Sequence, residues 1–136
     1  MSRKIHARKK IRSHLRKRGD HCDFEVTPAL IMYWWRYIND AIFDGQLLIP
    51  YKVLVRKFNH NDTLGACQGW GASKKRPVVL EMKEEFDDKE MFMAILAHEM
   101  VHQWEQQTHG RMSHGDNFFQ WQEKLKTIGL PLDETY

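Results

Sequence analysis

The feature that most constrains this 136-residue chain is the pattern H-E-x-x-H at residues 98–102. The surrounding run, Glu90 to Trp104, lacks Gly and Pro and is rich in Ala, Met, Leu, Glu and Gln, so it predicts a helix. Residues four apart share a helix face, so His98 and His102 can offer two imidazole nitrogens to one metal ion. Glu99 is then close enough to take a proton from a water on that metal. This set is typical of a zinc hydrolase acting on amide bonds.

The ends of this helix are also marked in the sequence. Asp87, with Glu90 three residues later, is a capping-box pattern. Gly110 is a natural C-terminal stop. The alternative is an ordinary core helix that carries two histidines. We favour the metal because ionisable side chains among apolar neighbours need polar partners, and a metal ion supplies them.

Three residues compete to be the third protein ligand. Glu123 lies on a later predicted helix, but at 100° per residue it points away from that helix's apolar face. His109 ends the metal helix, where histidine is also a favourable C-terminal residue. His114 directly precedes a helix that must pack back on the first, and we favour it. The metzincin pattern is excluded, because Glu105 and Thr108 occupy its glycine and histidine positions.

Length and cysteine usage bound the class of protein. At 136 residues, with 42% hydrophobic and 12% aromatic content, the chain predicts one domain with a packed core. No apolar run approaches the roughly 20 residues that span a membrane. Cys22 and Cys67 lie far apart without a C-x-x-C pattern, which excludes a disulfide scaffold and fits a reducing compartment. We therefore expect a cytoplasmic protein, in a bacterium or a phage-infected host, with association with the nucleoid as an option.

Charge is distributed unevenly along the chain. Residues 1–19 hold nine Lys/Arg and no acid, whereas the remainder holds twelve Lys/Arg against eighteen Asp/Glu, a formal charge of −6. We therefore divide the chain into a basic arm, residues 1–22, and a domain, residues 23–136. Dense cationic side chains neutralise phosphates, which predicts sequence-independent nucleic-acid binding; a solvated tail and a targeting peptide are the alternatives. The predicted nucleic-acid-binding residues are Arg3, Lys4, Arg8, Lys9, Lys10, Arg12, Arg16, Lys17 and Arg18.

The remaining segments predict an α+β domain with a small, three-stranded, mostly antiparallel sheet packed with helices. Thr27 and Pro28 are suited to open a helix as N-cap and first residue. The Leu64–Trp70 strand is also a candidate edge for an extended substrate peptide. The predicted elements are a helix over Ala29–Asp44, strands at Tyr51–Phe58, Leu64–Trp70 and Pro77–Met82, and a last helix over Asp116–Thr127.

Taken in order, these segments resemble the SprT-like (Spartan-type) zinc metalloprotease family over about residues 30–125. The metal helix is followed, as in that family, by a histidine in an H-G-x-x-F context, here His114–Phe118. Upstream, the similarity lies in the phrase Tyr37–Leu47 and in short strands such as Val53–Arg56, Leu64–Cys67 and Val78–Leu80. The resemblance implies one Zn²⁺ per chain on His98, His102 and His114, with Glu99 as the general base.

The resemblance also implies a function. Family members cleave proteins, and well-studied ones cleave proteins bound or crosslinked to DNA, so we expect a zinc metalloprotease acting on DNA-associated proteins. The cysteine zinc ribbon that follows the core in many members is missing here. The alternative is a non-proteolytic, zinc-stabilised nucleic-acid-binding or interaction module, against which Glu99 argues, because a structural site has no use for a base. Tyr33, Tyr37 and His109 are candidate oxyanion donors.

Overall fold

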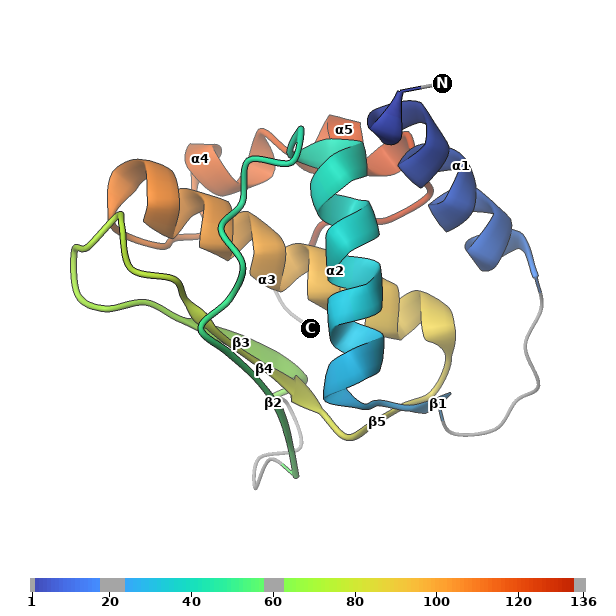
Figure 1. Cartoon of the computed structure of the whole chain (residues 1–136), viewed down its shortest axis with the longest axis horizontal. Helices are drawn as coiled ribbons and strands as arrows, with labels where there is room; N and C mark the ends of the chain where they lie inside the picture. Colours follow the sequence, from blue (N-terminus) through green and yellow to red (C-terminus); the bar gives the residue numbers. More distant parts are fainter. Residues whose placement is uncertain (1, 18–23, 58–62, 134–136) are drawn as a thin grey trace.

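The computed structural model describes residues 2–17, 24–57 and 63–133 and confirms the α+β class (Figure 1). Arg18 and Cys22, which the sequence analysis considered, and Phe58, the end of the first predicted strand, lie outside the described residues. Helices and strands mix along the chain, as the sequence predicts. The elements are α1 (Arg3–Arg16), β1 (Phe24–Glu25), α2 (Pro28–Ile42), β2 (Lys52–Arg56), β3 (Gly65–Gln68), β4 (Val79–Lys83), β5 (Glu85–Phe86), α3 (Lys89–His109), α4 (Asp116–Phe119) and α5 (Gln122–Lys126).

Helix α3 is the predicted metal helix and spans 21 residues. Its N-cap is Asp88, whose side chain accepts a hydrogen bond from the Met91 N–H (2.8 Å). The predicted capping box of Asp87 with Glu90 is therefore wrong by one residue, since Glu90 falls at the second helical position. Gly110 ends the helix as predicted, in the left-handed conformation (φ 72°). None of the described helices, α3 included, is long and apolar enough to cross a membrane.

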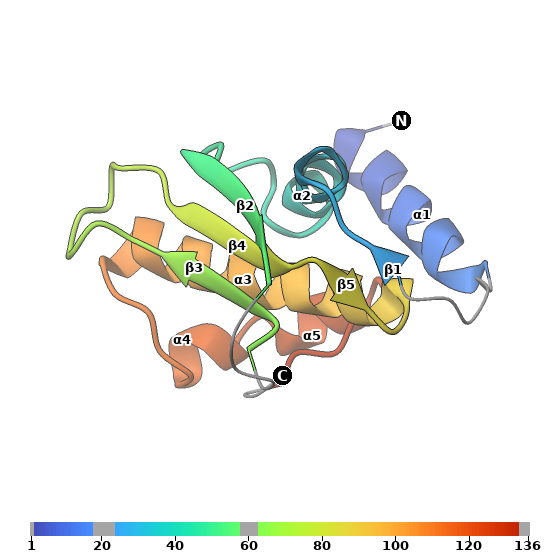
Figure 2. The same ribbon diagram turned by 90° about the horizontal axis from the view of Figure 1, so that it is seen from below.

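The three predicted strands form one sheet in the order β2-β4-β3, which lies across α3 (Figure 2). The sheet is mixed: β2 runs parallel to β4, and β3 runs antiparallel to it. The expected mostly antiparallel arrangement holds for β3 alone, because β4 enters between the two earlier strands. A period-2 pattern shows which face of a strand is buried, but it carries no information about strand direction.

Helix α2 completes the hydrophobic core. Thr27 caps it by accepting a hydrogen bond from the Leu30 N–H (3.1 Å), with Pro28 at the first turn, as predicted. The helix crosses α3 in Figure 1. Its aliphatic side chains meet the buried face of β4 and the apolar residues of α3. Fully buried members of this core are Ile31, Ile38, Ile42, Leu80, Met82, Phe92, Leu96 and Met100.

Glutamines at the C-terminal half of α3 fasten the loops beside it. Gln103 accepts from the Trp35 indole N–H (2.9 Å) and donates to the Leu48 carbonyl oxygen (2.6 Å). Gln106 donates to the carbonyl oxygens of Gly71 and Ser73, both at 2.9 Å. The loops before β2 and after β3 are therefore tied to the metal helix, which places the end of β3 beside it.

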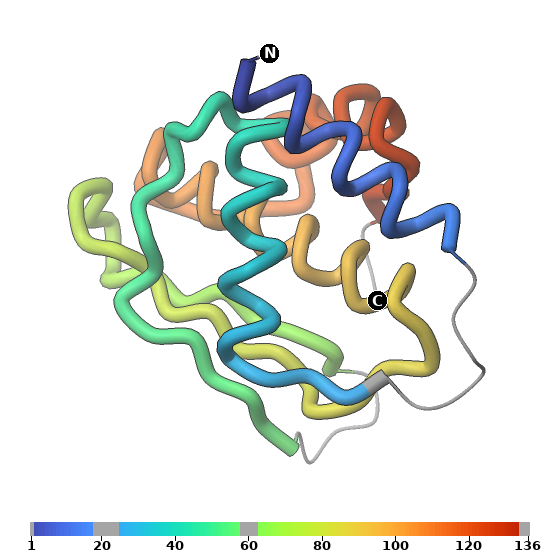
Figure 3. Tube along the Cα trace, turned by 45° about the vertical axis from the view of Figure 1, so that its right-hand side comes forward, coloured from blue at the N-terminus to red at the C-terminus, as the bar shows by residue number. Residues whose placement is uncertain are grey.

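The basic arm forms helix α1, on the outer side of α2 and away from the sheet (Figure 3). Ala7 and Ile11 are its buried residues. Arg8 donates from Nε to the Ala41 carbonyl oxygen (3.1 Å), and Lys4 pairs with Asp44 (2.8 Å). The first part of the arm is thus an ordered helix docked on the domain.

The last predicted helix is broken into α4 and α5 by a turn at Gln120 and Trp121. Phe118 and Leu125 are buried, as their spacing predicts. Both linking residues keep right-handed helical backbone angles, and the Phe118 ring faces α3 near His98 and His102. The apolar positions of this segment were predictable, but the single continuous axis was not correct.

Candidate metal centre

Three histidines from two segments converge on α3. His98 and His102 lie one turn apart on the helix, and His114 comes from the loop that enters α4. The Nε2 atoms of His102 and His114 are 3.1 Å apart. One ligand atom from each of the three histidines lies within 4.8 Å of the others. The three histidines can therefore hold one metal ion.

Each helix histidine is oriented through its other ring nitrogen. His98 Nδ1 lies 3.1 Å from the carbonyl oxygen of Asp133, and His102 Nδ1 lies 2.9 Å from Glu105 Oε1. Both acceptors favour the tautomer with the proton on Nδ1. That tautomer keeps the Nε2 lone pair for a metal, the arrangement usual for metal-binding histidines.

Glu105 links the helix to the loop that carries His114. It is only 1% exposed, and its Oε2 accepts hydrogen bonds from the Ser113 backbone N–H (3.2 Å) and hydroxyl (3.0 Å). The same carboxylate therefore orients His102 and fixes the residue before His114. Sequence analysis considered position 105 only to exclude the metzincin pattern. The available signal was an acid one turn after His102, on the same helix face.

Glu99 is buried beside the histidines and is incompletely partnered. Its Oε1 lies 3.8 Å from His98 Nε2, and its Oε2 is buried with no hydrogen-bond partner in the described part of the chain. Burial raises the pKa of Glu99 to about 8. A cation nearby favours the ionised form of a carboxyl and would oppose this shift.

The helix histidines are held neutral. Burial, with smaller contributions from the neighbouring histidines, lowers the pKa of both His98 and His102 to about 4. A neutral imidazole is the form that binds metal. At neutral pH the two rings are therefore ready to bind an ion without first losing a proton.

Phe118 forms an apolar wall at the centre. Its ring centroid lies 4.8 Å from those of His98 and His102 and 5.0 Å from that of His114, and its side chain is fully buried. The ring holds the imidazoles against rotation and excludes water from one side.

Strand β3 approaches the centre closely at Gly65. A Cβ added there would lie 2.9 Å from Ile95 Cγ2 and 3.3 Å from Glu99 Cγ. Any side chain would push the strand away from α3. Glycine is therefore needed for β3 to run directly beside the buried carboxylate.

These donors fit a metal of the zinc type. Three imidazole nitrogens match a catalytic zinc site, which keeps a position open for substrate. The buried, unpartnered Glu99 oxygen is an independent sign, because an orphaned carboxylate in a protein interior needs compensation. Imidazole also suits copper, iron and nickel, so the donor set supports a transition-metal ion.

The competing candidates lie elsewhere. His109 is exposed and packs its ring on Trp104, and Glu123 is exposed and pairs with Lys126 (3.2 Å). Burial, followed by the charges of Glu99 and Glu105, raises the pKa of the Cys67 thiol well above its usual range, so it stays protonated.

Two proposed oxyanion donors face another part of the molecule. Tyr33 makes edge contacts with Trp34 and Tyr37, and the Tyr37 ring lies 6.3 Å from that of His6 on α1. These contacts place both hydroxyl-bearing rings on the α1 side of α2. The oxyanion assignment stays a prediction that no contact near the histidines supports.

Comparison with known proteins identifies one family. The model of the SprT-like family matches residues 32–135, which include most of α2, the sheet, α3 and His114. No curated protein and no solved structure matches the chain significantly.

Proposed function

This chain belongs to the SprT-like family, and on that premise we propose that it is a zinc metallopeptidase that hydrolyses peptide bonds in proteins. His98, His102 and His114 are the proposed metal ligands and Glu99 the proposed general base. One observation carries the proposal: a buried carboxylate oxygen without a hydrogen-bond partner among the described residues stands beside three converging imidazoles.

The proposed chemistry divides between the metal and the chain. A bound zinc ion would act as a Lewis acid toward water and the scissile carbonyl. Glu99 accepts the proton of the attacking water and returns it to the leaving amine. Phe118 and the burial of the site exclude bulk water, which strengthens these electrostatic interactions. Glu105 and the Asp133 carbonyl oxygen keep His102 and His98 in the ligating tautomer.

An extended peptide fits the open side of β3. This strand pairs with β4 on one side, and no other described strand pairs with it. Main-chain groups on an unpaired edge can bind a substrate strand by hydrogen bonds. Since Gly65 brings this edge against Glu99, a peptide added along β3 would pass beside the proposed base.

We extend the proposal to protein substrates held on nucleic acid. The support is the charge of α1, whose residues Lys9, Lys10, Arg12, Arg16 and Lys17 are exposed. The rest of the chain is acidic and would repel phosphate. Nucleic acid bound to α1 would bring its associated proteins to the same molecule as the metal centre.

The decisive test compares the wild type with Glu99→Gln. Cleavage is followed by mass spectrometry on the chain itself, on unstructured proteins and on basic proteins bound to DNA. Removing a general base should lower cleavage by about a hundredfold to ten-thousandfold while the metal content and fold are kept. Glu90→Gln, which removes an exposed carboxyl from the same helix, is the matched control.

Equal turnover of the wild type and Glu99→Gln would overturn the proposed mechanism. A protein that binds one metal ion but cleaves none of these substrates would instead support the zinc-stabilised binding module.

A further inference from the structure

The exposed cations of α1 continue onto an aromatic surface of α2. One flank of α1 carries Lys10 and Lys17, which lie two turns apart, about 10 Å along the helix. Both line a small pocket of about 90 Å³ whose other wall is Tyr33 and Trp34 of α2; Ser13 and His14 complete it. The cationic flank and the aromatic side chains therefore meet in one place.

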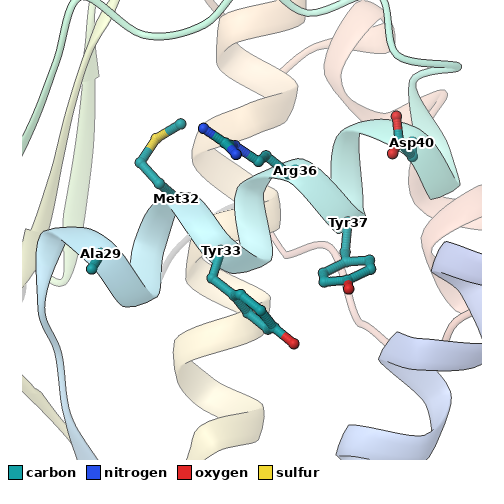
Figure 4. A pocket seen from close by; sticks show the side chains of 6 residues that line it. All are labelled: Ala29, Met32, Tyr33, Arg36, Tyr37 and Asp40. Atoms are coloured by element: carbon teal, nitrogen blue, oxygen red, sulfur yellow. The ribbon is translucent and has the colours of Figure 1, made fainter.

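A second, larger hollow adjoins the first at Tyr33. It has a volume of about 480 Å³, within the usual range of about 300–1,000 Å³ for ligand pockets. Its lining comes entirely from α2. Figure 4 shows Tyr33 and Tyr37 leaving the helix on one side, with Met32 and Arg36 on the other.

The Tyr33 ring is held in place by its neighbours but remains accessible to solvent. Tyr33 is 45% exposed, and its edge contacts with Trp34 and Tyr37 fix the plane of its ring. An exposed, oriented aromatic ring is a platform on which a nucleobase can stack. Asp40 is the acid at this site, and Arg3 lies 3.8 Å from it and offsets its charge.

We propose that α1 and the exposed face of α2 form a binding site for single-stranded nucleic acid, with a backbone phosphate at Lys10 and Lys17 and an unstacked base against Tyr33. This inference rests on the nucleic-acid part of the proposed function and is independent of proteolysis. Duplex bases are already stacked and cannot reach Tyr33, so the site distinguishes single strands from duplexes. An acidic peptide would use the cations and leave the aromatic platform without a ligand.

The test is the binding of the full chain to a labelled oligothymidylate and to a duplex of the same length, measured by fluorescence anisotropy at several salt concentrations. The wild type should prefer the single strand. Tyr33→Ala should weaken single-strand binding by about tenfold and change duplex binding little. Tyr33→Phe keeps the ring face and should bind like the wild type.

A second pair of variants, Lys10→Gln with Lys17→Gln, tests the role of charge. Binding should weaken for both nucleic acids, and the log–log salt slope on the single strand should shrink by about 0.7 for each phosphate that is no longer neutralised. Lys74→Gln with Lys75→Gln, and Tyr51→Ala, remove matched exposed groups from the opposite end of the molecule and should change neither. Circular dichroism and thermal unfolding of every variant establish that the fold is kept.

Each contrary outcome has a distinct meaning. Equal affinity for both nucleic acids, or equal effects of Tyr33→Ala and Tyr51→Ala, would overturn the single-strand site but leave the nucleic-acid role of α1. Absence of all binding by the wild type, or tighter binding to a polyglutamate peptide, would overturn both. Glu99→Gln should bind like the wild type, so the proteolytic proposal can fail without affecting this one.

Discussion

The metal centre and helix α1 both concentrate ionisable side chains. These side chains are buried and in contact with one another at the metal centre, whereas most of them are exposed on α1. At the metal centre the titratable groups of α3 are buried, and Glu105 alone makes contacts to His102 and to two donors of Ser113. On α1 most cations point into solvent, and the polar contacts of the helix involve Lys4, Arg8 and Arg3. Contacts therefore fix the positions of the side chains at the metal centre, whereas few contacts constrain the cationic side chains of α1.

The difference shows which interactions hold each region. Exposed ion pairs such as Lys4–Asp44 contribute about 0–1 kcal/mol, so α1 is held mainly by Ala7, Ile11 and the stacking of His14 on Trp34 (4.1 Å). Breaking a buried, hydrogen-bonded charge instead costs about 3–5 kcal/mol. Substitutions should therefore have large, specific effects at the metal centre and small, additive ones on α1.

The largest expected effect is the loss of a metal ligand. His102→Ala or His114→Ala should reduce zinc, measured by elemental analysis, from about one equivalent to a small fraction, and cleavage should disappear with it. Thermal stability should also fall, since metal at a thousand times its Kd stabilises the folded state by about 4 kcal/mol. His109→Ala should retain the metal. Full zinc content in both ligand variants would contradict the assignment of His102 and His114 as metal ligands.

A smaller effect is expected at Glu105, and it tests whether the buried contacts are functional. Glu105→Gln should weaken metal binding by about 10–100-fold, measured by competition with a chelator, because the hydrogen bond that orients His102 loses its charge. Glu123→Gln removes an exposed carboxyl and should leave metal affinity unchanged. Unchanged affinity in Glu105→Gln would mean that the charge of Glu105 is not needed to position His102.

Gly110, which ends α3, tests how much the stability of the domain depends on the backbone conformation at this helix end. Gly110 has φ 72°, and a Cβ there would lie 2.6 Å from the Ala72 carbonyl oxygen. Gly110→Ala should lower the free energy of unfolding by at least about 1 kcal/mol, measured by denaturant titration. The nearest atom to a Cβ on Gly115 is 3.7 Å away, so Gly115→Ala should cost less. Equal losses of unfolding free energy in the two variants would show that both positions tolerate a Cβ equally well.

The smallest expected effect is the pH dependence of α1. Burial, and then the charges of Lys89, Lys10 and Lys17, lower the pKa of His14 to about 4 from an unfolded value near 6.5. Between these values the unfolded state binds more protons, so this contribution to stability is lost as pH falls from about 6.5 toward 4. The protection factors of the α1 amides against hydrogen exchange should therefore fall with acid more in the wild type than in His14→Phe. Identical pH profiles for the wild type and His14→Phe would show that protonation of His14 does not affect the stability of α1.

Part of the metal centre was predictable because its determinants are local. The helical spacing of His98 and His102, the position of Glu99 and the stop at Gly110 follow from a 3.6-residue period and from the αL preference of glycine. The choice of cap between Asp87 and Asp88 depends on where the chain turns out of β5, and sequence analysis chose the wrong one.

The supports of the centre were not predictable in the same way. Glu105 is an ordinary helical acid until the loop of Ser113 folds onto it, and the Asp133 carbonyl oxygen comes from a segment 35 residues away from His98. Similarly, the interruption at Gln120 and Trp121 that separates α4 from α5 is not marked by a Gly or Pro in residues 116–127.

The sequence by itself therefore determined the helix over Lys89–His109 with His98, Glu99 and His102 on it, the basic character of residues 1–18, and the family. Each depends on composition or on residues within a few turns of each other. Only the tertiary structure brought His114 beside His98 and His102, placed β4 between β2 and β3, and brought Lys10 and Lys17 to Tyr33. These are relations between distant segments, and they are settled by which apolar faces pack together when the core forms.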